Sequence, residues 1–145
     1  MKRLKQIITI LLIIVCNTLT IEAKEHITYE RLINVIAHIE SGQNPNIVSK
    51  SGKYVGYLQI SKVCVDEANK ILKKKKYTYK DRLNKDKSIE IFHIIQNYHN
   101  PKRDVILAIR LWSEGLSAKY RKNQTTAYVR KVMKLYNGRY SHITE

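Results

Sequence analysis

Glu40 is the residue whose type and position best suit acid–base chemistry in this sequence. It closes an apolar run over residues 32–39, and a glycine-bearing alternating segment follows over residues 56–60. Cleavage of a glycosidic bond needs a proton donor that apolar surroundings keep protonated near neutral pH. Glu40 follows Ile36 and Ile39, so we expect its carboxyl to be partly buried. A carboxylate near a helix end is usually just solvated, so the assignment depends on the wider pattern.

Other chemistry-bearing residues give weaker signals. Many glycosidases use a second carboxylate, but none stands out here, since Asp66 and Glu67 occupy helical positions typical of a plain surface. If the reaction were hydrolytic, the second group would be sought among Asp66, Glu67 and Glu114. Cys64 lies between two valines and is expected to be a buried small apolar residue rather than a nucleophile. The five histidines show no paired metal-ligand spacing, so we predict no metal and no cofactor.

The elements that would position Glu40 are predicted from local patterns. Thr28 can cap a helix that ends at Gly42 and Pro45. Residues 46–60 predict two or three short strands with a turn near residues 50–53. Together they would place Glu40 in a cleft between a helix end and a small β-region.

The remaining elements are predicted to be helices, because apolar residues recur at helical spacing. Their expected caps are Ser61, Asp86, Asp104 and either Thr125 or Thr126, and the run Lys73 to Lys76 suits the C-terminal end of the first of these helices. The order of helix, small β-region and further helices predicts an α+β domain that is mostly helical.

Residues 1–23 read as a secretory signal peptide. Basic residues precede an apolar run over residues 7–15, which is too short to span a bilayer, and Ala23 ends a suitable cleavage site. Residues 24–145 would then form one exported domain in the periplasm or cell envelope. Lipoprotein processing at Cys16 is the alternative, although Val15 is bulkier than the small residue that this processing prefers.

The charge is strongly basic, with a formal net charge of +15 for the full chain. Removal of residues 1–23 leaves 24 basic and 11 acidic residues, or +13. An exported protein of this charge suits an anionic envelope polymer, and the alternative is a solvated surface rich in lysine. Nucleic acid would also attract it, but the leader and the lack of a recognition motif argue against that partner. We expect one compact monomeric domain.

Three segments together resemble the soluble lytic transglycosylase (SLT) family of the lysozyme-like superfamily. The family signature is Glu-Ser, a Ser-x-x-Gly step and Gly-Leu-Met-Gln-Ile, and it is matched here by Glu40-Ser41, Ser49 to Gly52 and Gly56 to Ile60. Tyr57-Leu58 replaces Leu-Met. Residues 111–115 match a later Ala-Tyr-Asn-x-Gly landmark only in part, and residues 126–129 match a Tyr-Val pair after Thr. The resemblance covers about residues 29–136.

The resemblance implies roles for individual residues. Glu40 would be the single catalytic acid/base, and the substrate-side positions would be Ser41, Ser49, Gly56, Gln59, Trp112, Ser113 and Tyr128. Ser41 and Ser49 would support the cleft, Gly56 would let the glycan approach, and Gln59 would supply an amide. Trp112 could stack on a sugar ring or belong to the core. Ser113 replaces the family's Asn, which leaves that hydrogen bond in doubt.

The implied activity is that of a peptidoglycan lytic transglycosylase. Such an enzyme cleaves the MurNAc–GlcNAc bond and forms 1,6-anhydromuramoyl products without water, and the substrate's N-acetyl group replaces a second carboxylate. A hydrolytic muramidase on the same fold and a non-catalytic glycan-binding domain are the alternatives. The sequence does not distinguish remodelling of the cell's own wall from service to a secretion or conjugation machine, or to a phage.

Overall fold

The computed structural model describes residues 29–121 and 126–138. The chain separates into two compact units, Met1–Leu32 and Ile33–Glu145. Within the first unit only residues 29–32 are described, and they are helical. The predicted leader, Cys16 and the predicted caps Thr28 and Thr125 lie outside the described residues. The fold described below is that of the second unit.

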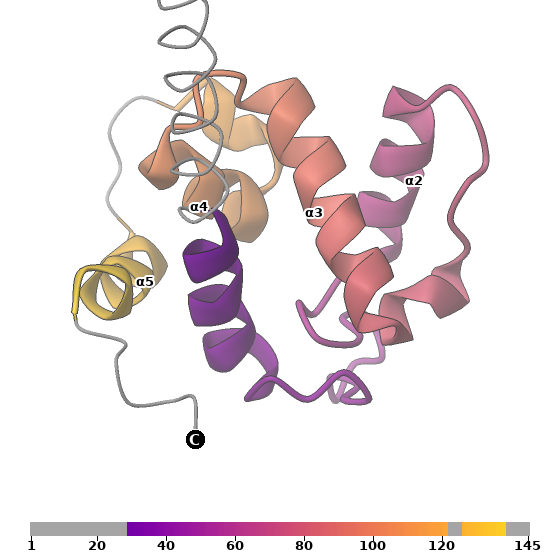
Figure 1. Ribbon diagram of the computed structural model, residues 1–145, viewed down its shortest axis with the longest axis horizontal. Coiled ribbons are helices and arrows are strands. Elements are labelled where there is room, and N and C mark those ends of the chain that lie inside the picture. The colour runs from indigo at the N-terminus through magenta and orange to yellow at the C-terminus, as the bar shows by residue number, and fades with distance from the viewer. Residues whose placement is uncertain (1–28, 122–125, 139–145) are drawn as a thin grey trace, which may run out of the picture. The chain divides into compact units, whose positions relative to one another are not determined.

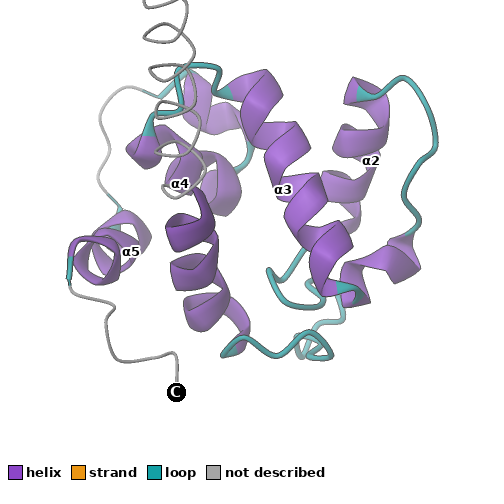
Figure 2. Ribbon diagram, viewed as in Figure 1, coloured by secondary structure: helices purple, strands orange, loops and turns teal. Residues whose placement is uncertain are grey.

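Helices make up most of the second unit (Figures 1 and 2). Its elements are the helical residues 33–41, α2 (Lys62–Ile71), the 3₁₀ helix η1 (Tyr79–Leu83), α3 (Lys85–His99), α4 (Val105–Glu114), the 3₁₀ helix η2 (Leu116–Lys119) and α5 (Ala127–Asn137). The mostly helical prediction is therefore confirmed.

The helix caps follow the sequence closely. Asp104 accepts a hydrogen bond from the Leu107 amide at 2.7 Å, and Thr126 accepts one from the Val129 amide at 3.2 Å. The predicted cap Asp86 was wrong by two residues, because Asn84 caps α3. Asn84 is as good a capping residue as Asp, and Asp86 then lies in the first turn, where its negative charge suits the helix dipole.

Two polar segments flank each other between α2 and α3. Residues 79–83 form η1, where Thr78 and Asp81 form a reciprocal capping box. The run Lys73 to Lys76 lies beyond the end of α2, which stops at Ile71. These lysines therefore belong to the loop between α2 and η1 and are not the last turn of the helix.

The helices of the second unit pack in two groups. α2 packs against α3 and η1, and α4 packs against α5 and η2. Glu67 Oε1 of α2 lies at hydrogen-bond distance, 2.8 Å, from His99 Nε2 of α3, with both side chains largely buried. The largest fully buried side chains of this unit include Ile36, Leu58, Tyr77, Phe92 and Ile109. None of the helices in the described ranges is long and apolar enough to cross a bilayer.

The small β-region was predicted wrongly in its extent. Residues 46–60 form two isolated antiparallel bridges, Val48 with Val55 and Val55 with Ile60, and turns fill the rest of the segment. Backbone φ is positive at Gly52 (70°), Gly56 (83°) and Gln59 (50°). A strand needs φ near −120° to −140° at successive residues, so these three positions stop every ladder after one pair.

Candidate active site

One cleft gathers residues from the helical residues 33–41, the 46–60 segment, α2, α4 and α5. It has a volume of about 460 Å³, and it is lined by Glu40, by Lys53, Tyr54 and Gln59, by Ser61, Val63 and Cys64, by residues 111–115 and by Tyr128. Five of the predicted site residues therefore share one cleft: Glu40, Gln59, Trp112, Ser113 and Tyr128. Three others, Ser41, Ser49 and Gly56, do not line it.

Glu40 is half-buried in the last helical turn before Gly42, where the chain leaves the helix. The Tyr128 hydroxyl on α5 donates a hydrogen bond to Glu40 Oε1 at 2.5 Å, across 88 positions of sequence. Burial, together with this hydrogen bond, raises the pKa of Tyr128 well above its usual value. The phenol therefore stays a donor and orients the carboxyl, while Oε2 accepts no hydrogen bond from the described residues and is available to a substrate oxygen.

Gln59 lines the cleft from the 46–60 segment. Its side-chain amide donates to the carbonyl oxygens of Gly56 at 3.0 Å and Ile47 at 3.3 Å. These bonds fix the side chain in place and use its donors on the protein backbone. What Gln59 can offer a glycan is therefore mainly its carbonyl oxygen, which accepts a hydrogen bond from a sugar hydroxyl.

Trp112 and Ser113 close the α4 side of the cleft. The Trp112 ring packs on Phe92 with ring centroids 5.1 Å apart, while the residue also lines the cleft. Trp112 therefore contacts a core ring and also lines the cleft, and its stacking on a sugar ring stays a prediction. Ser113 donates its hydroxyl proton to the Ile109 carbonyl at 3.0 Å, so it does not offer that proton to a substrate.

Ser41 and Ser49 act on the walls of the cleft and do not line it. Ser41 is buried, and its hydroxyl lies 2.7 Å from the Tyr57 carbonyl oxygen, which ties the helix end to the 46–60 segment. Ser49 accepts a hydrogen bond from the Tyr54 amide at 3.0 Å. Through this bond it holds the backbone of Tyr54, which does line the cleft.

Gly56 allows a close approach of two backbone segments, and the atom that comes close belongs to the protein and not to a glycan. A Cβ atom built on Gly56 would lie 1.8 Å from the Arg82 carbonyl oxygen. Its φ of 83° also lies in the region that favours glycine. The prediction that glycan approaches this residue is therefore replaced by a close contact between the 46–60 segment and η1.

Sequence reasoning missed one prominent cleft residue. Tyr54 is an exposed aromatic side chain in the 46–60 segment, and its place in an alternating stretch is the only signal for it. Glu114 lies in the cleft beside Ser113, and its carboxylate pairs with Arg110, with Arg110 Nε 3.4 Å from Glu114 Oε1. Of the three acids that the sequence offers as a second carboxylate, Glu114 is the one that lines the cleft.

Cys64 is less buried than the sequence predicts. Cys64 lines the cleft, with its sulfur 3.5 Å from the Ser61 hydroxyl oxygen. Its side chain is only partly buried, whereas a buried residue was expected. Within residues 29–121 and 126–138, no group of three or more His, Cys, Asp or Glu side chains is placed to hold a metal ion.

Comparison with known proteins supports this assignment at the level of the family. A family model described as "Transglycosylase SLT domain" matches residues 19–138. Searches of curated proteins and of solved structures returned no match. Because the family match spans most of the chain, the protein belongs to the transglycosylase SLT domain family, which indicates a lysozyme-like fold and lytic transglycosylase activity on peptidoglycan.

Proposed function

We propose that the protein is an exported peptidoglycan lytic transglycosylase that uses Glu40 as its single acid/base. The observation that carries this proposal is the hydrogen bond from Tyr128 to Glu40 inside a cleft that also presents Gln59 and Trp112. The Glu40 carboxyl accepts the Tyr128 hydrogen bond at Oε1 and leaves Oε2 open to the substrate. A single carboxyl group can therefore give a proton and later take one at the same place. Such proton transfer contributes about 10²–10⁴-fold to a rate.

The reaction would proceed in two steps at Glu40. The protonated carboxyl gives its proton to the glycosidic oxygen while the bond from C1 of the muramoyl residue to that oxygen breaks. The carboxylate then takes the proton of the C6 hydroxyl, whose oxygen bonds to C1 and closes the 1,6-anhydro ring. No water is consumed. The substrate's N-acetyl group would stabilise the positive charge at C1, which removes the need for a second carboxylate.

Glu40→Gln and a product analysis test this proposal together. The amide is nearly isosteric with the acid but cannot exchange the proton, so purified sacculi should be cleaved at least about 100-fold more slowly. Mass spectrometry of wild-type digests should show 1,6-anhydromuropeptides as the main products. A variant that clears sacculi at half the wild-type rate, with an unchanged unfolding temperature, would refute the role of Glu40.

The hydrolytic alternative is favoured by one specific observation, the presence of Glu114 in the same cleft. A second carboxylate can activate water as a general base, and the ion pair with Arg110 would hold Glu114 in place. Products with reducing ends, lost in Glu114→Gln, would select this mechanism. If Glu114→Gln still forms anhydro products at a rate close to wild type, Glu114 has no part in the chemistry.

Export remains part of the proposal and rests on residues 1–23 of the sequence. Cleavage after Ala23 predicts an envelope form of the protein that begins at Lys24, which intact-mass measurement would show. Lipid attached to a protein that begins at Cys16 would instead support the lipoprotein alternative. The catalytic and cleft residues all lie beyond either cleavage site.

A further inference from the structure

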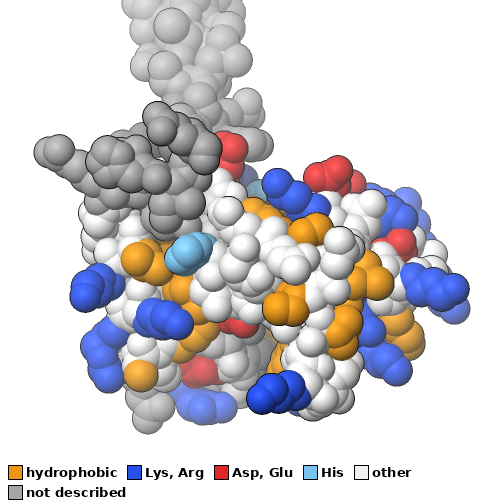
Figure 3. All heavy atoms as spheres, turned by 90° about the horizontal axis from the view of Figure 1, so that it is seen from below, with side chains coloured by type: hydrophobic (Ala, Val, Ile, Leu, Met, Phe, Trp, Pro, Cys, Tyr) orange, Lys and Arg blue, Asp and Glu red, His pale blue; other side chains and the backbone are white. Residues whose placement is uncertain are grey.

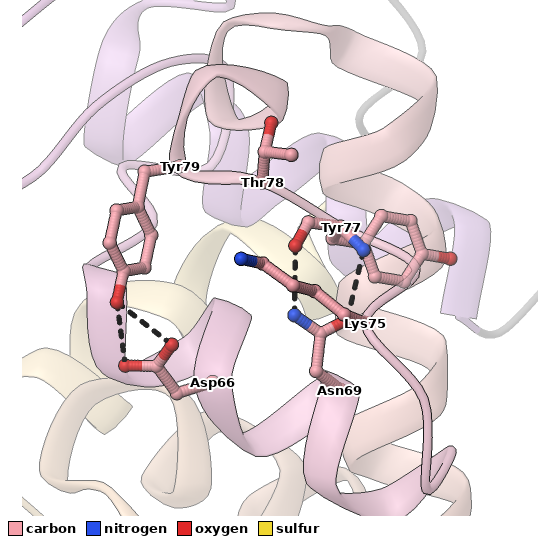
Figure 4. Close-up of a pocket in the computed structure, with 6 residues that line it drawn as sticks. All are labelled: Asp66, Asn69, Lys75, Tyr77, Thr78 and Tyr79. Atoms are coloured by element: carbon pink, nitrogen blue, oxygen red, sulfur yellow. Dashed lines mark hydrogen bonds between the residues drawn. The ribbon is translucent and has the colours of Figure 1, made fainter.

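A second and smaller pocket lies beside α2 (Figure 4). Its volume is about 180 Å³, and it is lined by Asp66 and Asn69 of α2 and by Lys75, Tyr77, Thr78 and Tyr79 of the following segment. Sites for whole small molecules usually have volumes of about 300–1,000 Å³. The pocket therefore suits a single group of the size of an amino acid.

The wall of this pocket is held in place by hydrogen bonds. The Asn69 side chain donates to the Tyr77 carbonyl at 2.8 Å and accepts from the Tyr77 amide at 2.9 Å. The hydroxyl of the buried Tyr77 donates to Glu90 at 2.6 Å, and the Thr78 amide donates to Asp81 at 2.7 Å. A ligand would meet a pocket that is already formed, which lowers the entropic cost of binding.

The pocket presents two opposite charges that do not pair with each other. Asp66 accepts a hydrogen bond from the Tyr79 hydroxyl at 3.0 Å, and this bond raises the pKa of Tyr79. Lys75 forms no ion pair or hydrogen bond within the described part of the chain. Figure 4 shows its ammonium pointing into the space in front of Asn69 and Tyr79. An acceptor and a cation on two sides of one small space are complementary to a zwitterion.

The pocket and the main cleft are both lined by residues of α2. Val63 lines the cleft and Asp66 lines the pocket. Residues three apart on a helix are neighbours on its surface, about 5–6 Å apart at Cβ. Peptidoglycan is a glycan with short peptide branches, so a glycan strand in the cleft could send a branch towards this pocket.

We propose that this pocket binds a zwitterionic amino-acid group of a peptidoglycan peptide branch, with its ammonium on Asp66 and its carboxylate on Lys75. Both contacts would be charge-assisted hydrogen bonds, which are stronger than neutral ones. The inference rests on the proposed function, because that function supplies a substrate with peptide branches. A polyanion fits the pocket less well, since Asp66 would repel it.

A titration of the purified protein with three probes, followed by NMR, tests the ligand. The probes are a stem tripeptide amide that carries diaminopimelate, the same peptide with lysine in its place, and free diaminopimelate. Only the first is a peptide whose side chain ends in an ammonium and a carboxylate on the same carbon atom, and it should shift amide signals of residues 66–79. The lysine peptide should bind about tenfold more weakly or worse. Equal binding of the lysine peptide, or tighter binding of the free amino acid, would overturn the proposal.

Variants of the two charged residues test the site. Asp66→Asn and Lys75→Gln should each weaken binding of the diaminopimelate peptide about tenfold or more. Lys74→Gln is the matched control, since it removes a charge from the neighbouring residue, which does not line the pocket, and it should bind like wild type. Equal affinity in all four proteins, or effective competition by poly-aspartate, would overturn the proposal. Unchanged unfolding temperatures would show that each variant folds.

The failure of this proposal can be told apart from failure of the proposed function. Sacculi stripped of peptides by an amidase offer glycan without branches. Asp66→Asn should lower the cleavage rate on intact sacculi more than on stripped ones, and equal losses on both would contradict a branch-binding role. If the wild-type protein cleaves neither material, the proposed function fails, while the peptide titration still decides what the pocket binds.

Discussion

At the scale of single residues, the contact between Glu40 and Tyr128 organises the cleft. Tyr128 comes from α5 and Glu40 from the helical residues 33–41, so the pair exists only when both elements are in place. We regard Tyr128 as a positioning residue, because it touches the proposed acid/base and acts through it. Its hydroxyl selects which oxygen of Glu40 remains open to the substrate.

Tyr128→Phe should lower kcat about 10- to 100-fold. The variant keeps the ring but removes a hydrogen bond to a group that is charged during the reaction, and such bonds contribute about 1.5–3 kcal/mol. Release of muropeptides at saturating sacculus concentration measures the effect. Tyr120→Phe is the control, since Tyr120 is 85 % exposed and lies outside the cleft. Equal rates in both variants would show that Tyr128 does not position the acid.

Gly56→Ala should damage folding before it damages chemistry. The new Cβ would collide with the Arg82 carbonyl oxygen, and φ at this residue is 83°. Backbone strain and overpacking together should cost about 2–5 kcal/mol, which thermal unfolding would show as a lower midpoint. Gly52→Ala separates the two causes, because Gly52 has φ of 70° with no atom within 4 Å of the added Cβ. Gly52→Ala should lose only about 1–2 kcal/mol of stability. A loss as large as that of Gly56→Ala would contradict the steric explanation.

At the scale of elements, η1 holds the 46–60 segment against the rest of the unit. Arg82 is 8 % exposed and donates to three carbonyl oxygens, those of Tyr79 at 2.8 Å and of Lys53 and Ile60 at 3.2 Å each. Its own carbonyl meets Gly56 and accepts a hydrogen bond from the Ser88 hydroxyl. A single buried arginine therefore replaces the ladder hydrogen bonds that a longer sheet would have supplied.

Arg82→Met should loosen the cleft wall that carries Lys53 and Tyr54. The substitution removes the three hydrogen bonds that the guanidinium donates, and hydrogen bonds to a charged group contribute about 1.5–3 kcal/mol each. We expect faster amide hydrogen exchange in residues 53–60 and a fall in stability of about 3 kcal/mol. Lys80→Met, an exposed change in the same 3₁₀ helix, should stay within about 0.5 kcal/mol of wild type. Unchanged exchange in residues 53–60 would show that other contacts hold the wall.

At the scale of the whole molecule, charge is the dominant property of the surface. Lysine and arginine side chains are spread over the face that Figure 3 shows, without a single basic patch. In the run Lys73 to Lys76, Lys76 forms an ion pair with Glu90 at 2.8 Å. The other three lysines are exposed, so the part of the run available to an anionic polymer is smaller than the sequence indicated.

Sacculus binding should weaken with salt and depend on the loop lysines. Exposed charges are screened over about 8 Å at physiological ionic strength, so a pull-down at low and high salt measures the electrostatic share. Lys73→Gln combined with Lys74→Gln should reduce binding at low salt. Lys131→Gln combined with Lys134→Gln removes the same charge from α5. If both pairs lose binding equally, net charge matters more than the loop, and if neither does, the basic surface is only solvated.

The sequence by itself determined the family and most of the helices, and it supplied Glu40 as the proposed acid. Helical spacing of apolar residues and local caps such as Asp104 and Thr126 are short-range signals, so they could be read without the fold. The Glu40-Ser41 motif is equally local. The extent of the β-region could not be read this way, because alternation predicts strands whereas the positive φ at Gln59 accompanies contacts with the Gly56 and Ile47 carbonyls.

Only the tertiary structure decided which residues meet. Tyr128 reaches Glu40 across 88 positions, Glu114 enters the same cleft, and Gly56 faces Arg82. Each of these contacts depends on how helices and loops distant in sequence pack together, and residue spacing alone does not encode that. The pocket at Asp66 and Lys75 is of the same kind, since its two charges come from different elements and meet only after α2 packs against the segment that follows it.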